Sequence, residues 1–212
     1  SKVIGIALKD RGAILPAGHS ADAAYWFDEH SGNWISSSYY LKDLPQWVKD
    51  FNAQKLPKEY LQKGWETLYP IVSYRQSLPD QSFYEGSFGS HEKTSFPYHF
   101  IKDEKIQLSS LKTTPFANKL TLELAKQAIV GEQLGIDIDT DLLTISLSGT
   151  DYIGHHFGPN SVEIEDAYLR LDKVLEAFFV FLDKKIGKNN YLFFLTADHG
   201  GAHNPDFLQE RK

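Results

Sequence analysis

The sequence predicts an α/β fold, a mostly parallel sheet with helices on both faces, together with one irregular, aromatic-rich insert. Residues 2–8 and 141–149 are apolar almost throughout, as strands covered on both faces are. Residues 191–200, "YLFFLTADHG", begin with another such run and follow a long helical pattern. Strand, helix and strand in this order predict a βαβ unit with parallel strands and a right-handed crossover.

Composition excludes several classes of protein. The chain has 212 residues, 42% of them hydrophobic, which is enough for one sizeable core. A net charge of -6 argues against a general nucleic-acid or anionic-membrane surface. No apolar run reaches the roughly 18 residues that a membrane span needs. Because there is no cysteine, any transition metal must be held by histidine and carboxylate.

The first predicted strand, residues 2–8, ends at "KDRG" and therefore carries Lys9 and Arg11 at its carboxyl end. On an extended chain these two side chains point to the same side, because they are two residues apart. One ammonium and one guanidinium would suit a dianionic tetrahedral group such as phosphate or sulfate. The alternative is a solvated strand end, with Asp10 as the local counter-charge.

Residues 19–113 have a different character. They contain all 4 Trp, many Tyr and scattered Pro, and only residues 44–54 show a helical pattern. Since linkers are poor in aromatic residues, we expect a cap packed over a site. The sequence therefore predicts one partial catalytic domain over residues 1–212, with residues 19–113 as its cap or insert.

Two long helices are predicted in the second half of the chain. Residues 114–135 begin with Thr114 as a candidate cap and Pro115 at the first helical position. Residues 160–187 open with Asn160 and Glu163 at capping-box spacing and close on Gly187.

Acidic and imidazole side chains gather after the second and third predicted strands. Asp151 and His155 lie four residues apart in the loop after residues 141–149, and Asp198 and His199 are adjacent after the last apolar run. Ligands of open parallel sheets bind beyond the carboxyl ends of the strands. Either pair alone is more often structural, but their joint placement favours a nitrogen and oxygen site for a divalent metal, with zinc the best candidate.

Three further histidines near these strand ends, His19, His156 and His203, are interpreted as surface or hydrogen-bonded side chains.

These motifs resemble a known family. "TDYIGHHFGP", followed further along the chain by "TADHG", resembles the metal-binding half of the alkaline phosphatase superfamily, which includes nucleotide pyrophosphatases and phosphodiesterases. "KDRGAILPAGH" is similar to the flavobacterial-type, phosphate-irrepressible alkaline phosphatases. The resemblance spans essentially the whole chain.

The resemblance implies a two-zinc phosphoric monoester hydrolase acting on a phosphate ester, in a periplasmic or secreted location. It implies that Asp151 and His155 bind one Zn²⁺ and that Asp198 and His199 bind the second. Lys9 and Arg11 would then contact the phosphoryl oxygens as catalytic and substrate-binding residues.

The chain also departs from the family pattern. The family expects an N-terminal Asp ligand, a Thr or Ser nucleophile with an Asn, and a late His, and no segment here matches them. Each zinc would have two protein ligands, whereas catalytic zinc usually has three. We therefore expect the central part of a longer enzyme, inactive or nearly so by itself.

Three other interpretations remain open. The first is a phosphodiesterase or nucleotide pyrophosphatase of the same superfamily, in which Lys9 and Arg11 have another duty. The second is a non-catalytic metal- or anion-binding domain, and the third treats the polar strand ends as purely structural. A parallel sheet that lacks strands of its parent would expose an edge, so self-association or partial disorder is expected.

Overall fold

The computed structural model describes residues 1–88, 94–102 and 105–210. Its centre is a four-stranded sheet in the order β3-β2-β1-β6. Strand β1 pairs in parallel with β2 and β6, and β2 pairs antiparallel with β3, which confirms the mostly parallel sheet. The strands are β1 (Val3–Ala7), β2 (Ala23–Asp28), β3 (Asn33–Ile35) and β6 (Leu142–Ser146), with a separate antiparallel pair β4 (Ile101–Lys102) and β5 (Lys105–Ile106).

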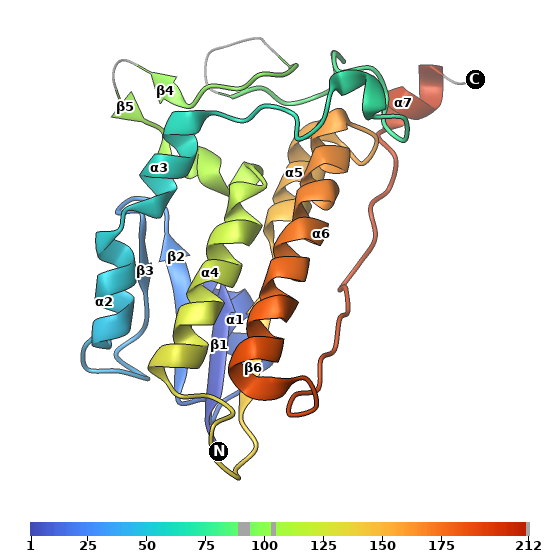
Figure 1. The fold of residues 1–212 in the computed structure, drawn as a ribbon. Coiled ribbons are helices and arrows are strands. Elements are labelled where there is room, and N and C mark those ends of the chain that lie inside the picture. The colour runs from blue at the N-terminus through green and yellow to red at the C-terminus, as the bar shows by residue number, and fades with distance from the viewer. Residues whose placement is uncertain (89–93, 103–104, 211–212) are drawn as a thin grey trace.

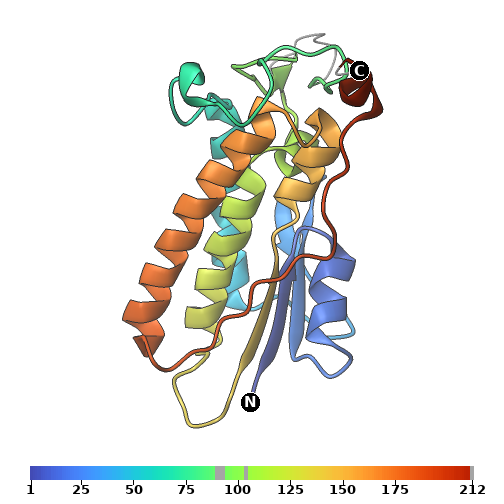
Figure 2. The same cartoon turned by 90° about the vertical axis from the view of Figure 1, so that its right-hand side faces the viewer.

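Helices cover both faces of the sheet, as predicted (Figures 1 and 2). Helix α1 packs on one face, and α4 packs on the other with α2 and α6 beside it. The helices are α1 (Asp10–Ala17), α2 (Gln46–Ala53), α3 (Leu56–Lys63), α4 (Phe116–Gly131), α5 (Gly149–Phe157), α6 (Val162–Leu182) and α7 (Pro205–Glu210). Shorter turns are η1 (Ile71–Ser73), η2 (Leu108–Thr113) and the π-helical turn η3 (Asp183–Gly187).

Strand β1 lies between two hydrophobic clusters of different size, one on each face of the sheet. Ile4 and Ile6 are buried in the large core, while Ala7 belongs to a small cluster with Ala13 of α1. A Cβ on Gly5 would lie 2.0 Å from the backbone oxygen of Ala13. Only a residue without a side chain therefore lets α1 pack this closely, and this packing fixes where the chain turns after β1.

The predicted insert begins later than residue 19. Residues 23–35 form β2 and β3 of the main sheet, where Tyr25 and Trp34 are almost completely buried. Part of the aromatic content thus belongs to the core. Helix α2 confirms the helix predicted at residues 44–54, whereas α3 was not predicted. Between α3 and η2, the described residues form only the short turn η1 and the two-residue strands β4 and β5, and the role of this part as a cap stays a prediction.

Both long helices are confirmed, but their caps differ from the prediction. The Thr114 hydroxyl donates to the carbonyl of Leu111 at 2.7 Å, and Pro115 precedes α4. The Ser161 hydroxyl accepts the amide of Ile164 at 3.2 Å and so caps α6. Because Ser161 is the cap, Glu163 is not at the third helical position that a capping box needs, and its buried carboxylate instead accepts from the Tyr98 hydroxyl at 2.5 Å. The turn η3 ends at Gly187, as predicted.

The prediction of a third strand in the βαβ unit is wrong. Residues 191–200 form no strand in the structure, and the side chains of Leu192 and Phe194 are 80% and 81% exposed. This segment runs along the β6 side of the sheet without pairing to it (Figures 1 and 2). Strand β6 is therefore an edge strand within the described ranges, half-buried and not covered on both faces.

Within residues 1–88, 94–102 and 105–210, no helix combines the length and apolar character needed to cross a membrane.

Candidate functional site

The parallel strands β1, β2 and β6 bring their carboxyl ends to the same edge of the sheet. Lys9 follows β1, Glu29 follows β2, and α5 begins shortly after β6. These segments are distant in sequence and meet only because the strands run in the same direction.

Asp151 and His155 lie on a helix, not in the predicted loop. Asp151 is in the first turn of α5 and His155 is one turn later, so both side chains share one helix face. The amide of Gly149 donates to Asn118 Oδ1 of α4 at 2.8 Å, and a Cβ on Gly149 would lie 2.7 Å from that oxygen. The start of α5 is thereby fixed against α4, and Gly158, with a φ of 92°, follows its end.

Asp151 is the centre of a charged cluster. Its Oδ2 accepts a hydrogen bond from Lys9 Nζ at 2.9 Å. Its Oδ1 lies 3.2 Å from His155 Nε2 and 3.5 Å from His199 Nε2. The structure therefore brings together members of both predicted metal pairs and one of the predicted phosphate-binding cations.

The cluster shifts the pKa of Asp151 and of His199. Partial burial acts to raise the pKa of Asp151, but the hydrogen bond and charge of Lys9, helped by His155 and His199, lower it overall. The pKa of His199 is raised, first by its hydrogen bond to the Gly200 carbonyl and then by the negative charges of Asp198 and Asp151. Both shifts favour the charged forms and so strengthen the cluster.

Asp198 is not brought into this cluster. Its side chain is 93% exposed, its Oδ1 accepts the amide of His199 at 3.1 Å, and its Oδ2 lies 3.8 Å from His199 Nε2. Asp151, His155 and His199 are the donor types that zinc prefers. However, in the described part of the chain no three His, Asp or Glu side chains are arranged to hold a metal ion.

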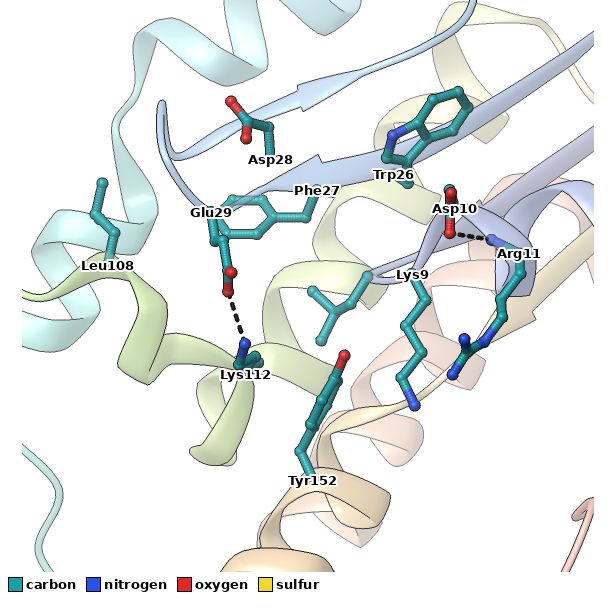
Figure 3. Close-up of a pocket in the computed structure, with 11 residues that line it drawn as sticks. Lys9, Asp10, Arg11, Trp26, Phe27, Asp28, Glu29, Leu108, Lys112 and Tyr152 are labelled. Atoms are coloured by element: carbon teal, nitrogen blue, oxygen red, sulfur yellow. Dashed lines mark hydrogen bonds and ion pairs between the residues drawn. The ribbon is translucent and has the colours of Figure 1, made fainter. Parts of the chain in front are cut away.

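Lys9 and Arg11 both line a cavity of about 380 Å³ (Figure 3). The prediction placed them on an extended chain. Instead, Lys9 caps α1 with extended backbone and Arg11 lies in the first helical turn. The Arg11 amide donates to Asp10 Oδ1 at 2.6 Å. The other residues that line the cavity are Leu8, Asp10, Trp26, Phe27, Asp28, Glu29, Leu108, Lys112 and Tyr152.

Three residues of this cavity that contact one another, Tyr152, Lys112 and Glu29, were not predicted as site residues. The ring centroid of Tyr152 lies 4.4 Å from Lys9 Nζ and 5.6 Å from Lys112 Nζ. Lys112 Nζ in turn donates to Glu29 Oε2 at 2.9 Å. Tyr152 had a sequence signal, because it stands beside Asp151 in "TDYIGHH". Lys112 and Glu29 had none, since their pairing depends on the fold.

The three further histidines that the sequence singles out, His19, His156 and His203, make ordinary hydrogen-bonding contacts. His156 Nε2 lies 3.2 Å from the Ser87 carbonyl oxygen, and burial lowers the pKa of this histidine. His203 Nδ1 lies 2.7 Å from Asn160 Oδ1, and His19 Nε2 lies 3.5 Å from the Tyr39 hydroxyl. These contacts agree with the structural interpretation of all three.

With the cations and the acid–imidazole cluster placed at one edge of the sheet, comparison of the sequence with known families shows the class of protein. The sequence model of the type I phosphodiesterase / nucleotide pyrophosphatase family matches residues 1–211, and the chain belongs to this family.

Several individual members of the family are similar to this chain, among them alkaline phosphatases. The chain is 54% identical over 211 residues to the alkaline phosphatase PhoV of Synechococcus elongatus, covering 100% of this chain and 38% of PhoV. It is 52% identical over 213 residues to the alkaline phosphatase PafA of Elizabethkingia meningoseptica, covering 39% of that protein. A crystal structure of wild-type alkaline phosphatase PafA superposes with a TM-score of 0.94 at 50% identity, over 100% of this chain and 41% of the other. The resemblance seen in the sequence is confirmed, and the chain spans less than half the length of these relatives.

Proposed function

We propose that this chain supplies phosphate-binding and metal-binding residues to a phosphoric monoester hydrolase of the alkaline phosphatase type. One observation carries the proposal: the cavity lined by Lys9 and Arg11 adjoins the cluster of Asp151, His155 and His199, because Lys9 belongs to both. The names of the relatives PhoV and PafA support this class of reaction.

Lys9 and Arg11 would bind the phosphoryl group of the substrate. A phosphate monoester is a dianion, and the guanidinium fork and the ammonium match its oxygens in charge and in hydrogen bonding. Since the chain carries a net charge of -6, this attraction has to be local. These two side chains would orient the phosphoryl group and offset its charge.

Zinc is the cofactor that we propose. Asp151 and His155 would hold one ion, and Asp198 and His199 would hold the second, with further ligands needed for each. Bound zinc would stabilise the attacking and leaving oxygens of an in-line displacement. In support, Asp151, His155 and His199 already lie together. Asp198 Oδ2 lies 3.8 Å from His199 Nε2, although the Asp198 side chain is 93% exposed.

A phosphodiesterase is the second candidate, favoured by the description of the family to which the chain belongs. Arg11→Ala in the complete enzyme separates the two. A monoesterase should lose far more activity on a monoester than on a diester, because the monoester carries the additional negative charge. Equal losses on both substrates would favour the diesterase.

Diffraction at the zinc absorption edge, from a crystal of this chain soaked in zinc, tests the metal-binding half of the proposal. We expect anomalous peaks beside Asp151 with His155 and beside Asp198 with His199. Calorimetry with inorganic phosphate tests the other half. Lys9→Ala and Arg11→Ala should each weaken binding, whereas Lys63→Ala, an exposed control on α3, should not. Absence of zinc peaks together with unchanged phosphate affinity would overturn the proposal.

We also propose a periplasmic or secreted location, which rests on the family resemblance. Fractionation of the native cells, followed by detection of the protein with an antibody, tests it. Recovery with the cytoplasmic fraction would contradict it.

A further inference from the structure

We propose that Tyr152 is a positioning residue for Lys9, and that Lys112 and Glu29 support it from the opposite side of the ring. This inference rests on the proposed function, in which Lys9 binds the phosphoryl group. It concerns contacts that join four segments: the end of β1, the end of β2, the turn η2 and the helix α5.

Lys9 needs restraint because a lysine ammonium sits on a flexible four-carbon stem. Two neighbours provide it. Asp151 accepts a hydrogen bond from Lys9 Nζ at 2.9 Å, and the Tyr152 ring centroid lies 4.4 Å from the same nitrogen. The side chains of Lys9 and Asp151 are only 23% and 27% exposed, so solvent screens these contacts incompletely.

The two restraints differ in what they leave for a ligand. The Asp151 carboxylate neutralises the charge of Lys9, whereas an aromatic face attracts an ammonium without cancelling its net charge. A lysine held by the ring therefore keeps its attraction for an incoming phosphate. The ring therefore orients the Lys9 ammonium without competing with phosphate for it, whereas the Asp151 carboxylate competes with phosphate for the same ammonium.

The ring is itself supported. Figure 3 shows Tyr152 between the ammonium groups of Lys112 and Lys9, with all three side chains directed into the cavity. Lys112 Nζ lies 5.6 Å from the ring centroid and is anchored by Glu29 Oε2 at 2.9 Å. The ordered series Glu29, Lys112, Tyr152, Lys9 thus reaches from β2 to the charged cluster.

The test uses the 212-residue chain with inorganic phosphate as the probe. Tyr152→Leu removes the aromatic face and should weaken phosphate binding about fivefold to tenfold, as expected for one cation–π contact. Tyr152→Phe keeps the face and should bind like the unmodified chain. Tyr168→Leu is the control, because Tyr168 lies on α6, is 58% exposed and is not among the cavity residues.

A double mutant separates positioning from a general structural role. If Tyr152 acts through Lys9, then Tyr152→Leu should have no further effect on phosphate affinity in a Lys9→Ala background. Equal weakening in both backgrounds would overturn the proposal. Circular dichroism on every variant establishes that the fold is retained.

Nitrogen-15 spectra of the lysine ammonium groups give a readout independent of phosphate. The Lys9 resonance should carry a ring-current shift that persists in Tyr152→Phe and disappears in Tyr152→Leu. An unshifted Lys9 resonance would overturn the positioning role even if phosphate binds. Conversely, a shifted resonance in a chain that does not bind phosphate would overturn the proposed function and leave the Lys9–Tyr152 contact established.

Discussion

The ammonium nitrogen of Lys9 lies 2.9 Å from Oδ2 of Asp151, although 142 positions separate the two residues in the sequence. The contact joins the end of β1 to the first turn of α5. It links a candidate phosphate-binding cation directly to a candidate metal ligand. A substitution of Asp151 should therefore change the electrostatic environment of Lys9 and of the imidazoles of His155 and His199.

Asp198→Asn and Asp151→Asn should each lower the pKa of His199. Both carboxylates help to raise that pKa, and Asp198 contributes more than Asp151. Each variant should therefore lose the proton from His199 at a lower pH than the unmodified chain, with the larger change in Asp198→Asn. Proton NMR titration of the imidazole measures this. An unchanged pKa in both variants would place His199 away from the cluster.

Glu85→Gln should flatten the dependence of stability on pH. Burial, with the nearby charges of Glu163 and Asp80, raises the pKa of Glu85 to about 8. Between pH about 4.5 and about 8, the unfolded chain releases a proton that the folded chain retains, so the free energy of unfolding falls as pH rises. Glutamine has no ionisable carboxyl group and stays neutral, so the variant should be more stable than the unmodified chain at pH 9.

Urea unfolding at pH 5, 7 and 9 checks the behaviour of Glu85. Glu176→Gln, an exposed position on α6, is the matched control and should follow the unmodified chain. Parallel pH curves for Glu85→Gln and the unmodified chain would show that Glu85 is not kept protonated by burial.

Gly5→Ala should destabilise the fold by about 1 to 3 kcal/mol, the usual cost of overpacking. The new methyl group would start 2.0 Å from the Ala13 carbonyl oxygen, so α1 would have to move away from β1. Gly200→Ala is the control, because nothing lies within 4 Å of a Cβ there. Denaturant midpoints compare the two, and similar midpoints would contradict the close β1–α1 packing.

The isolated chain should self-associate. Strand β6 has an open edge within the described residues, and Phe194, in the unpaired segment 191–200, is 81% exposed. Phe194→Lys should reduce the associated fraction in sedimentation velocity, since a charge disfavours edge pairing. Val72→Lys, at a similar 80% exposure on η1, should not. A monomer at all concentrations would refute this expectation.

The purified 212-residue chain should not hydrolyse p-nitrophenyl phosphate, with or without zinc. The reason is that each proposed zinc site has two protein ligands, fewer than catalytic sites use. Release of p-nitrophenol followed by absorbance measures this. Zinc-dependent turnover that Asp198→Asn abolishes would overturn the expectation.

Several elements were open to prediction and others were not. Apolar runs predict the strands β1 and β6, and helical periodicity predicts the helices α4 and α6. Strands β2 and β3 were assigned to the insert, because buried aromatic residues such as Trp34 look the same in a cap and in a sheet. Helix α5 was expected to be a loop, since "GTDYIGHHF" contains two glycines and few strong helix formers. Burial of Ile153 and Phe157 and the contact with Asn118 stabilise it as a helix.

The sequence by itself determined the class of the fold, the family and the residue types at the strand ends. These depend on local patterns and on motifs that are contiguous in the chain. Only the tertiary structure decided that His199 meets Asp151 while Asp198 faces solvent, and that Lys112 and Glu29 support Tyr152. Such contacts join distant segments, and an apolar run such as residues 191–195 encodes a tendency to be buried without encoding the partner that buries it.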